Sequence, residues 1–323
     1  MPIDPYTIRF GLSSSSGASA APTEKVDVET ATLADSTVVA IHNVANDGEF
    51  PFMVSLQRRF EPGQRGHVCG GTLISLQHVL TAASCLYESA SGTPTLINLE
   101  YYRIFGGYHN LGSNMNDPTR VRMIESFVIH PDFVGGNGHL NDIAILVLDS
   151  PFVASNRLQP IALPEQNEQP DVQATCAVPG WGKKVGTDTF MANRLKYSTQ
   201  SIANNQESCI KQYTDKYNVP TVVNPNMVCA SATRALTYGC PGDEGTPMVC
   251  GNSANRRLVA LAFTSVRCGI STEPLLYTRV SPYADWARTV IGQSTSSSTT
   301  FQPAVAMVFI LAVTQFVTSK FSL

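Results

Sequence analysis

The sequence has no run of clustered basic residues, and this absence excludes one large class of partners. Its 323 residues contain 22 Lys and Arg against 25 Asp and Glu, which gives a formal net charge of −3. A protein that neutralises nucleic-acid phosphates needs a basic face or stripe. We therefore expect no nucleic-acid partner.

Metal-binding patterns and N-glycosylation signals are also missing. The eight cysteines are widely spaced, with no Cys-x-x-Cys pair and no histidine nearby at zinc-ligand spacing. No Asn-x-Ser/Thr sequon occurs. We expect no metal and no cofactor. An even number of dispersed cysteines instead indicates disulfides, and hence an oxidising, extracellular compartment.

The N-terminus lacks the signal that such a compartment requires. Met1 to Phe10 reads MPIDPYTIRF and contains no apolar run of the length needed for export. We therefore expect that a signal peptide is missing from this sequence. Residues 1–38 are rich in Ser, Ala and Thr, and they indicate a flexible N-terminal segment.

The C-terminal residues 293–323 combine a polar spacer with a hydrophobic tail. Ser/Thr-rich residues 294–300 precede an apolar run from Ala304 to Val317. This order is typical of a glycolipid (GPI) anchor signal. The run is short for a membrane-spanning helix, which needs about 20 residues. An anchor signal is the favoured interpretation, and a short membrane anchor or a tail without function are the alternatives.

Between these ends the chain consists of short runs of alternating polarity separated by Gly, Pro and Asn. The clearest runs are 52–56, 71–75, 101–105, 121–129, 143–148 and 258–263. Many short strands with turn residues between them indicate an antiparallel sandwich or barrel. One late segment, 282–291, has helical spacing, with Tyr283, Trp286 and Ile291 able to share a face.

Several motifs resemble, in the same order, those of the chymotrypsin/trypsin-like (S1) serine proteases. They are Val39-Ala-Ile-His42, Gly48-Glu-Phe-Pro51, Cys69-Gly-Gly-Thr-Leu-Ile74, Leu80-Thr-Ala-Ala-Ser-Cys85, Asn141-Asp-Ile-Ala-Ile-Leu146, Gly180-Trp-Gly182, Cys240-Pro-Gly-Asp-Glu-Gly-Thr-Pro247 and Tyr277-Thr-Arg-Val280. The resemblance covers residues 39–292. It implies an all-β domain of two packed six-stranded antiparallel β-barrels with a C-terminal helix.

The resemblance also implies how the cysteines pair. The family's bridges would join Cys69 with Cys85, Cys176 with Cys250, Cys209 with Cys229, and Cys240 with Cys268. All eight cysteines are then used. Each bridge would stabilise the fold by about 2 to 4 kcal/mol.

Two of the family's three catalytic positions carry other residues. Ser84 stands where the family has its histidine, Glu244 stands where it has its serine, and Asp142 keeps the aspartate. A serine hydroxyl is too weak a base near neutral pH, and a carboxylate is a poor nucleophile toward an amide. The resemblance therefore implies a degenerate triad with no functional catalytic residue.

Neighbouring positions of the family's site are altered as well. We expect Glu244 to occupy the oxyanion hole, which includes the amide of Gly242. Tyr238 at the base of the specificity pocket and Leu275 on its wall should fill that pocket. Asp142 is expected to be buried, and satisfied by amides near Ser84 and by a hydroxyl.

Ser265 is one candidate for the hydroxyl that contacts Asp142.

Proteolytic activation is also expected to be lost, because no Lys or Arg occurs between Lys25 and Arg58 and the Val38–Val39 junction offers no trypsin-like cleavage site. Asp243, the usual partner of the new amine, must then stay solvated or find another partner.

The favoured function is that of a non-catalytic S1 homologue, a pseudoprotease that acts as an extracellular binding or regulatory protein. Its partner would be a protein: an active protease, its substrate or its inhibitor. The alternative is an active serine endopeptidase. Two further alternatives use His139 as a substitute base or Asp142 and Glu244 as a glycosidase-type carboxylate pair. A purely structural secreted protein is the last.

Overall fold

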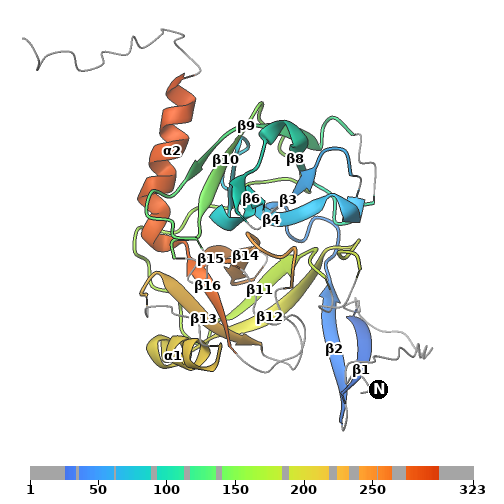
Figure 1. Ribbon diagram of the computed structural model, residues 1–323, viewed down its shortest axis with the longest axis vertical. Coiled ribbons are helices and arrows are strands. Elements are labelled where there is room, and N and C mark those ends of the chain that lie inside the picture. Colours follow the sequence, from blue (N-terminus) through green and yellow to red (C-terminus); the bar gives the residue numbers. More distant parts are fainter. Residues whose placement is uncertain are drawn as a thin grey trace, which may run out of the picture.

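The computed structural model describes residues 26–33, 36–61, 63–88, 93–112, 117–135, 140–183, 189–217, 224–232, 240–252, 254–263 and 274–297. Within these residues the chain forms two antiparallel barrels that stack against each other (Figure 1). The predicted all-β fold of two six-stranded barrels with a C-terminal helix is confirmed.

The first barrel closes in the order β10-β5-β4-β3-β8-β9. Its strands are β3 (Met53–Arg58), β4 (His67–Leu73), β5 (His78–Thr81), β8 (Tyr102–Gly106), β9 (Val121–Ile129) and β10 (Ala144–Leu148). A small hairpin of β6 (Tyr87–Glu88) and β7 (Thr95–Leu96) accompanies it. Five of the six runs predicted from alternation lie in or overlap these strands.

The second barrel contains β12-β11-β14-β15-β16-β13, and pairing of β12 with β13 closes the ring. Its strands are β11 (Thr175–Gly180), β12 (Lys196–Ile202), β13 (Met227–Ala232), β14 (Pro247–Cys250), β15 (Arg257–Ala262) and β16 (Leu275–Arg279). The sixth predicted run, 258–263, overlaps β15.

One continuous core joins the barrels. It includes Phe52 and Leu80 from the first barrel and Val249 and Leu261 from the second, all at most 4% exposed. Val290 of the C-terminal helix belongs to the same cluster. Burial of this shared apolar surface holds the two barrels together and fixes the loops between them.

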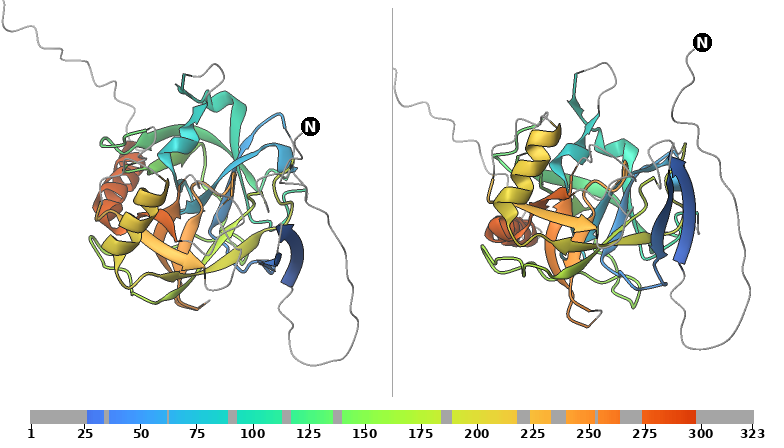
Figure 2. Two further views of the ribbon diagram at one scale, coloured as in Figure 1. Left: turned by 60° about the horizontal axis from the view of Figure 1, so that its bottom comes forward. Right: turned by 90° about the horizontal axis from the view of Figure 1, so that it is seen from below.

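The N-terminal segment differs from the prediction. Residues 1–38 were expected to be flexible, but β1 (Val26–Leu33) and β2 (Ser36–Val44) form a hairpin that continues the second sheet through pairing of β2 with β12. Val, Thr and Ile are frequent in these two runs and favour strands. Figures 1 and 2 show the hairpin on the side of the molecule away from both helices.

The C-terminal helix α2 (Ala284–Ser297) follows a short 3-10 turn, Ser281–Tyr283. Tyr283, Trp286 and Ile291 pack on the shared core, as the helical spacing predicted. Although α2 follows the last strand of the second barrel, it runs beside the first (Figure 1), where His78 Nε2 lies 2.7 Å from Ser294 Oγ. It extends beyond the predicted domain end at residue 292.

A second helix, α1 (Gln206–Tyr217), was not predicted. The Asn205 side chain accepts a hydrogen bond from the Ser208 amide at 2.9 Å, and Glu207 lies in the first turn. Both are ordinary helix-start signals that the sequence carries. Among the described residues, neither helix is long and apolar enough to cross a bilayer.

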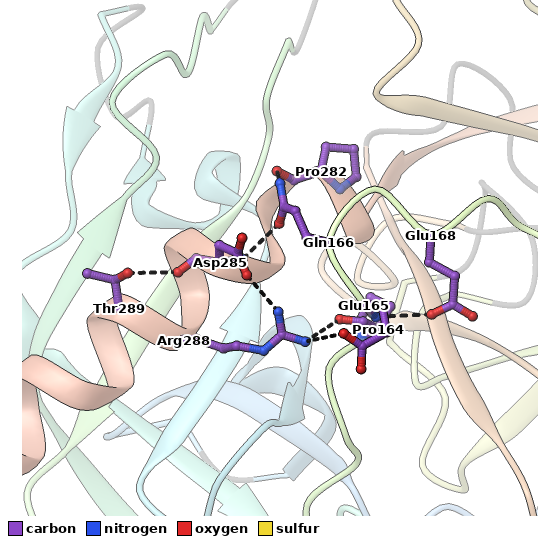
Figure 3. Close-up of polar contacts among 8 residues, drawn as sticks. All are labelled: Pro164, Glu165, Gln166, Glu168, Pro282, Asp285, Arg288 and Thr289. Atoms are coloured by element: carbon purple, nitrogen blue, oxygen red, sulfur yellow. Dashed lines mark hydrogen bonds and ion pairs between the residues drawn. The ribbon is translucent and has the colours of Figure 1, made fainter.

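Figure 3 shows the polar contacts that fix the start of α2. Gln166 Oε1 accepts a hydrogen bond from the Asp285 amide at 2.9 Å, and its Nε2 donates to the Pro282 carbonyl at 2.9 Å. Arg288 donates to the Pro164 carbonyl at 2.7 Å and to Asp285 Oδ1 at 2.8 Å. Gln166 therefore caps the helix from a distant loop.

Replacing Gln166 with Ala is expected to lower the free energy of unfolding by about 1 kcal/mol, because a first-turn amide loses its acceptor. Arg288→Ala is the matched control and should cost less, since the side chain is 40% exposed and surface ion pairs contribute little. Urea unfolding of both variants measures the difference. A larger loss for Arg288→Ala would contradict this assignment.

Candidate functional site

Loop 240–247 lies between the barrels and is held from both. The Gly70 amide of β4 donates to the Glu244 carbonyl at 2.8 Å, and the Gly245 amide donates to the Ala262 carbonyl of β15 at 2.7 Å. Gly245 has a φ of 77°, and a Cβ there would lie 2.5 Å from the Gly70 carbonyl oxygen. Only glycine fits this turn, so the loop has a fixed place in the fold.

The Glu244 carboxylate turns back onto its own loop. Its Oε2 accepts a hydrogen bond from the Gly242 amide at 2.7 Å. Desolvation raises the Glu244 pKa, and the nearby Asp142 carboxylate raises it further. The predicted contact between Glu244 and the Gly242 amide is therefore present.

Ser84 lies on a 3-10 turn, Ala83–Leu86, directly against Asp142. Its hydroxyl donates to Asp142 Oδ2 at 2.8 Å and its amide to Oδ1 at 2.7 Å. Asp142 is 0% exposed. The predicted burial and the predicted amide contact are confirmed, and Ser84 itself supplies a hydroxyl. Ser265, the candidate named from the sequence, lies outside the described residues.

Histidine side chains contribute no base to this cluster within the described part of the chain. Their ring contacts are with other groups: His67 with Ser55 and the Gly242 carbonyl oxygen, His78 with Ser75, His109 with Asp47, and His130 with the rings of Tyr283 and Trp286. His139, the candidate substitute base, lies outside the described residues, so that alternative stays a prediction.

Asp243 found another partner rather than staying solvated. Its Oδ1 accepts from the Gly182 amide at 2.7 Å and its Oδ2 from the Cys240 amide at 2.9 Å. A Cβ on Gly180 would lie 1.9 Å from Oδ1, and one on Gly182 2.4 Å from Oδ2. The Gly-Trp-Gly motif thus leaves room for the carboxylate. Desolvation raises its pKa to about 7.

Val39 stands where the family has the residue whose new amino group pairs with the aspartate after cleavage, but here it does not lie beside Asp243. It lies within β2, where it pairs with Thr30 of β1. As an internal residue of the uncleaved chain, Val39 has no free amine to offer Asp243.

His67 is a residue of the site that sequence reasoning missed. Its Nδ1 lies 2.7 Å from Ser55 Oγ and its Nε2 lies 2.8 Å from the Gly242 carbonyl oxygen. Because a carbonyl only accepts, Nε2 carries the proton and Ser55 donates to Nδ1. Burial lowers the His67 pKa to about 4, so the ring is neutral. The ring thus holds the Gly242 carbonyl in place. In the sequence, the signal for this residue was its position two residues before Cys69.

The specificity pocket is described only in part. Leu275 begins β16, is half-buried and packs on the apolar cluster around Cys176 and Cys250. Tyr238 lies outside the described residues. Filling of the pocket by these two side chains therefore stays a prediction.

Three of the expected disulfides are confirmed: Cys69–Cys85, Cys176–Cys250 and Cys209–Cys229. Cys240 is also disulfide-bonded. Its expected partner, Cys268, lies outside the described residues, so the fourth pair stays a prediction.

Comparison with known proteins gives the same family over most of the chain. The family model described as Trypsin matches residues 41–287. Urokinase-type plasminogen activator of Gallus gallus is 34% identical over 226 residues, which cover 68% of this chain and 50% of that protein. Phenoloxidase-activating factor 3 of Holotrichia diomphalia is 31% identical over 249 residues, which cover 75% of this chain and 69% of that protein.

The structure of human heparin binding protein superimposes with a TM-score of 0.61 over 78% of this chain and 96% of that one, at 24% sequence identity, which shows the shared fold. The chain spans only half the length of the plasminogen activator that it matches. The family match, the two closed barrels and the loop between them agree, and the chain belongs to the trypsin-like (S1) family of serine proteases.

Proposed function

We propose that this protein is a non-catalytic member of the trypsin family that acts as an extracellular binding or regulatory protein. The observation that carries the proposal is the 2.7 Å hydrogen bond from the Gly242 amide to Glu244 Oε2. In this family that amide helps to hold the negative oxygen that forms during peptide cleavage. The resident carboxyl group uses this donor, and in its ionised form it also places negative charge where further negative charge must develop.

The opposite wall of the site supports the same proposal. An active protease needs a base that removes a proton from its nucleophile. Here Ser84 occupies that position, and its hydroxyl donates its own proton to Asp142 at 2.8 Å. The Ser84 hydroxyl is thus a hydrogen-bond donor to Asp142, and a neutral hydroxyl is too weakly basic to act as the general base.

The proposed partner is a protein: an active protease, its substrate or its inhibitor. A peptide that inserts a carbonyl oxygen beside Gly242 would have to displace Glu244. We therefore propose that the partner docks on other surfaces of the barrels. The disulfides support an extracellular location, and attachment to the outer cell surface through residues 293–323 is part of the proposal.

The purified protein is expected to show no fluorophosphonate labelling and no turnover of peptide amides above about one millionth of trypsin's rate, because losing a single member of such a triad already costs about that factor. Trypsin is the positive control, and Glu244→Ala is the matched variant. Reproducible turnover that Glu244→Ala abolishes would support the alternative, an active endopeptidase with a carboxylate in the site.

A further inference from the structure

A hollow on the second barrel lies outside the site described above. It is bordered by the 164–171 loop, by β15 and by the end of β16, and its volume is about 430 Å³ with its open mouth included. Pro164, Leu258 and Val259 form part of its wall. It shares no lining residue with loop 240–247 or with the Ser84–Asp142 pair.

Arg279 is the buried charge in this hollow, with only 8% of the residue exposed. Its Nη1 donates to Gln169 Oε1 at 2.7 Å, whereas its buried Nε has no hydrogen-bond partner among the described residues. Burial disfavours the charged form and lowers the Arg279 pKa. A buried donor without an acceptor is costly, which makes an acceptor from outside the chain favourable.

The carboxylates nearby leave this guanidinium uncompensated. Glu168 Oε1 pairs with Arg257 Nη1 at 2.9 Å, and Glu168 Oε2 accepts from the Glu165 amide at 3.0 Å. Asp171 also lines the hollow, but it is exposed at the surface. Within the described part of the chain, Arg279 forms no ion pair with either carboxylate. One edge of the guanidinium, Nε with the adjacent Nη2, thus has no acceptor among the described residues, and it becomes available to a ligand when the side chains that cover Nε move aside.

We propose that this hollow binds a carboxylate ligand, with the carboxylate against the available edge of Arg279 and an aliphatic group against Leu258 and Pro164. Guanidinium and carboxylate are matched in shape and form two parallel hydrogen bonds. Glu168 and Asp171 repel a dianion more strongly than a monoanion, which favours a carboxylate over a phosphate. The ligand is either the C-terminus of a peptide that ends in an aliphatic residue or a small aliphatic acid.

Titration of the full chain with N-acetyl-leucine, followed by NMR, is expected to show saturable binding in the millimolar range. N-acetyl-leucine amide should bind at least about tenfold more weakly, because the charge-assisted hydrogen bonds are lost. Inorganic phosphate should also bind more weakly than N-acetyl-leucine. Acetyl-Ala-Leu represents a peptide C-terminus and isovalerate represents a free aliphatic acid. The one that binds more tightly identifies which of the two kinds of ligand the hollow prefers.

Two variants test the assignment to Arg279. Arg279→Gln should weaken N-acetyl-leucine binding at least about tenfold, while the exposed Asp171→Asn should strengthen it about twofold by removing a like charge. Equal binding of the acid and the amide, or full binding by Arg279→Gln, would overturn the proposal. If Arg279→Gln does not fold, Asp171→Asn and the acid–amide comparison still decide it. Peptide hydrolysis plays no part in these readouts, so they are independent of the proposed function.

Discussion

A variant that carries both Ser84→His and Glu244→Ser is expected to react with fluorophosphonates at least about a hundredfold faster than the wild-type protein. Asp142 already directs both oxygens at residue 84, at 2.7 and 2.8 Å, and would orient an imidazole there. Removal of the Glu244 carboxylate releases the Gly242 amide. His67 continues to hold Gly242 through its carbonyl.

Each single substitution is expected to stay at the wild-type level. Ser84→His alone supplies a base without a nucleophile, and Glu244→Ser alone supplies a nucleophile without a base, and such groups act only as a unit. The matched control is Ser84→His with Glu244→Ala, which clears the amide but adds no hydroxyl. Labelling rates followed by mass spectrometry compare all four variants. A double variant no faster than this control would contradict the view that the rest of the loop is intact.

The second large effect is on how folding stability depends on pH. Desolvation raises the Asp243 pKa from 3.8 to about 7, so the folded protein holds this proton more tightly than the unfolded chain and stability rises as pH falls from 7 toward 3.8. Burial lowers the His67 pKa from 6.5 to about 4, so stability is lost as pH falls from 6.5 toward 4. Between pH 6.5 and 4 the two contributions oppose each other.

Replacing either Asp243 or His67 should reveal how the other residue makes the unfolding free energy depend on pH. Asp243→Asn is expected to lose about 2 to 3 kcal/mol of unfolding free energy, relative to wild type, when the pH falls from 6.5 to 4.5, and His67→Gln to gain a similar amount. Chemical denaturation at both pH values gives each slope. Only slopes are compared, because both replacements also change hydrogen bonds. If the unfolding free energies of the two variants depend on pH in the same way, neither Asp243 nor His67 has the shifted pKa that its burial predicts.

Motif order was enough to predict the two barrels, and the residue types at positions 84, 142 and 244 are the basis of the proposal that the chain is non-catalytic. The contact from Gly242 to Glu244 was predictable too, because a side chain two residues from a glycine amide has few other places to put a carboxylate. These predictions depend on local chain geometry. They needed no knowledge of packing.

The partners of the Asp243 carboxylate and of the Gly242 carbonyl could not be predicted in the same way. The Asp243 carboxylate accepts hydrogen bonds from the Gly182 and Cys240 amides. It fits there because Gly180 and Gly182 have no side chains. That space forms only when segments far apart in the sequence come together in the fold. His67 was equally hard to identify, because its position two residues before Cys69 does not reveal that its ring meets the carbonyl of Gly242, a residue far away in the sequence. The N-terminal hairpin was missed because Ser- and Ala-rich composition outweighed the alternation of its Val and Thr residues.

Glu244 can also be regarded as a ligand that is covalently attached beside its own receptor. A group tethered so closely has an effective concentration of millimolar or more, and it keeps the loop occupied at every dilution of the protein. A free inhibitor that presents an oxyanion must compete with this tethered ligand, and dissociation never removes the competitor. In a mixture with active proteases, such inhibitors would therefore be taken up by the enzymes, while this protein would keep its protease-shaped outer surface available for other partners.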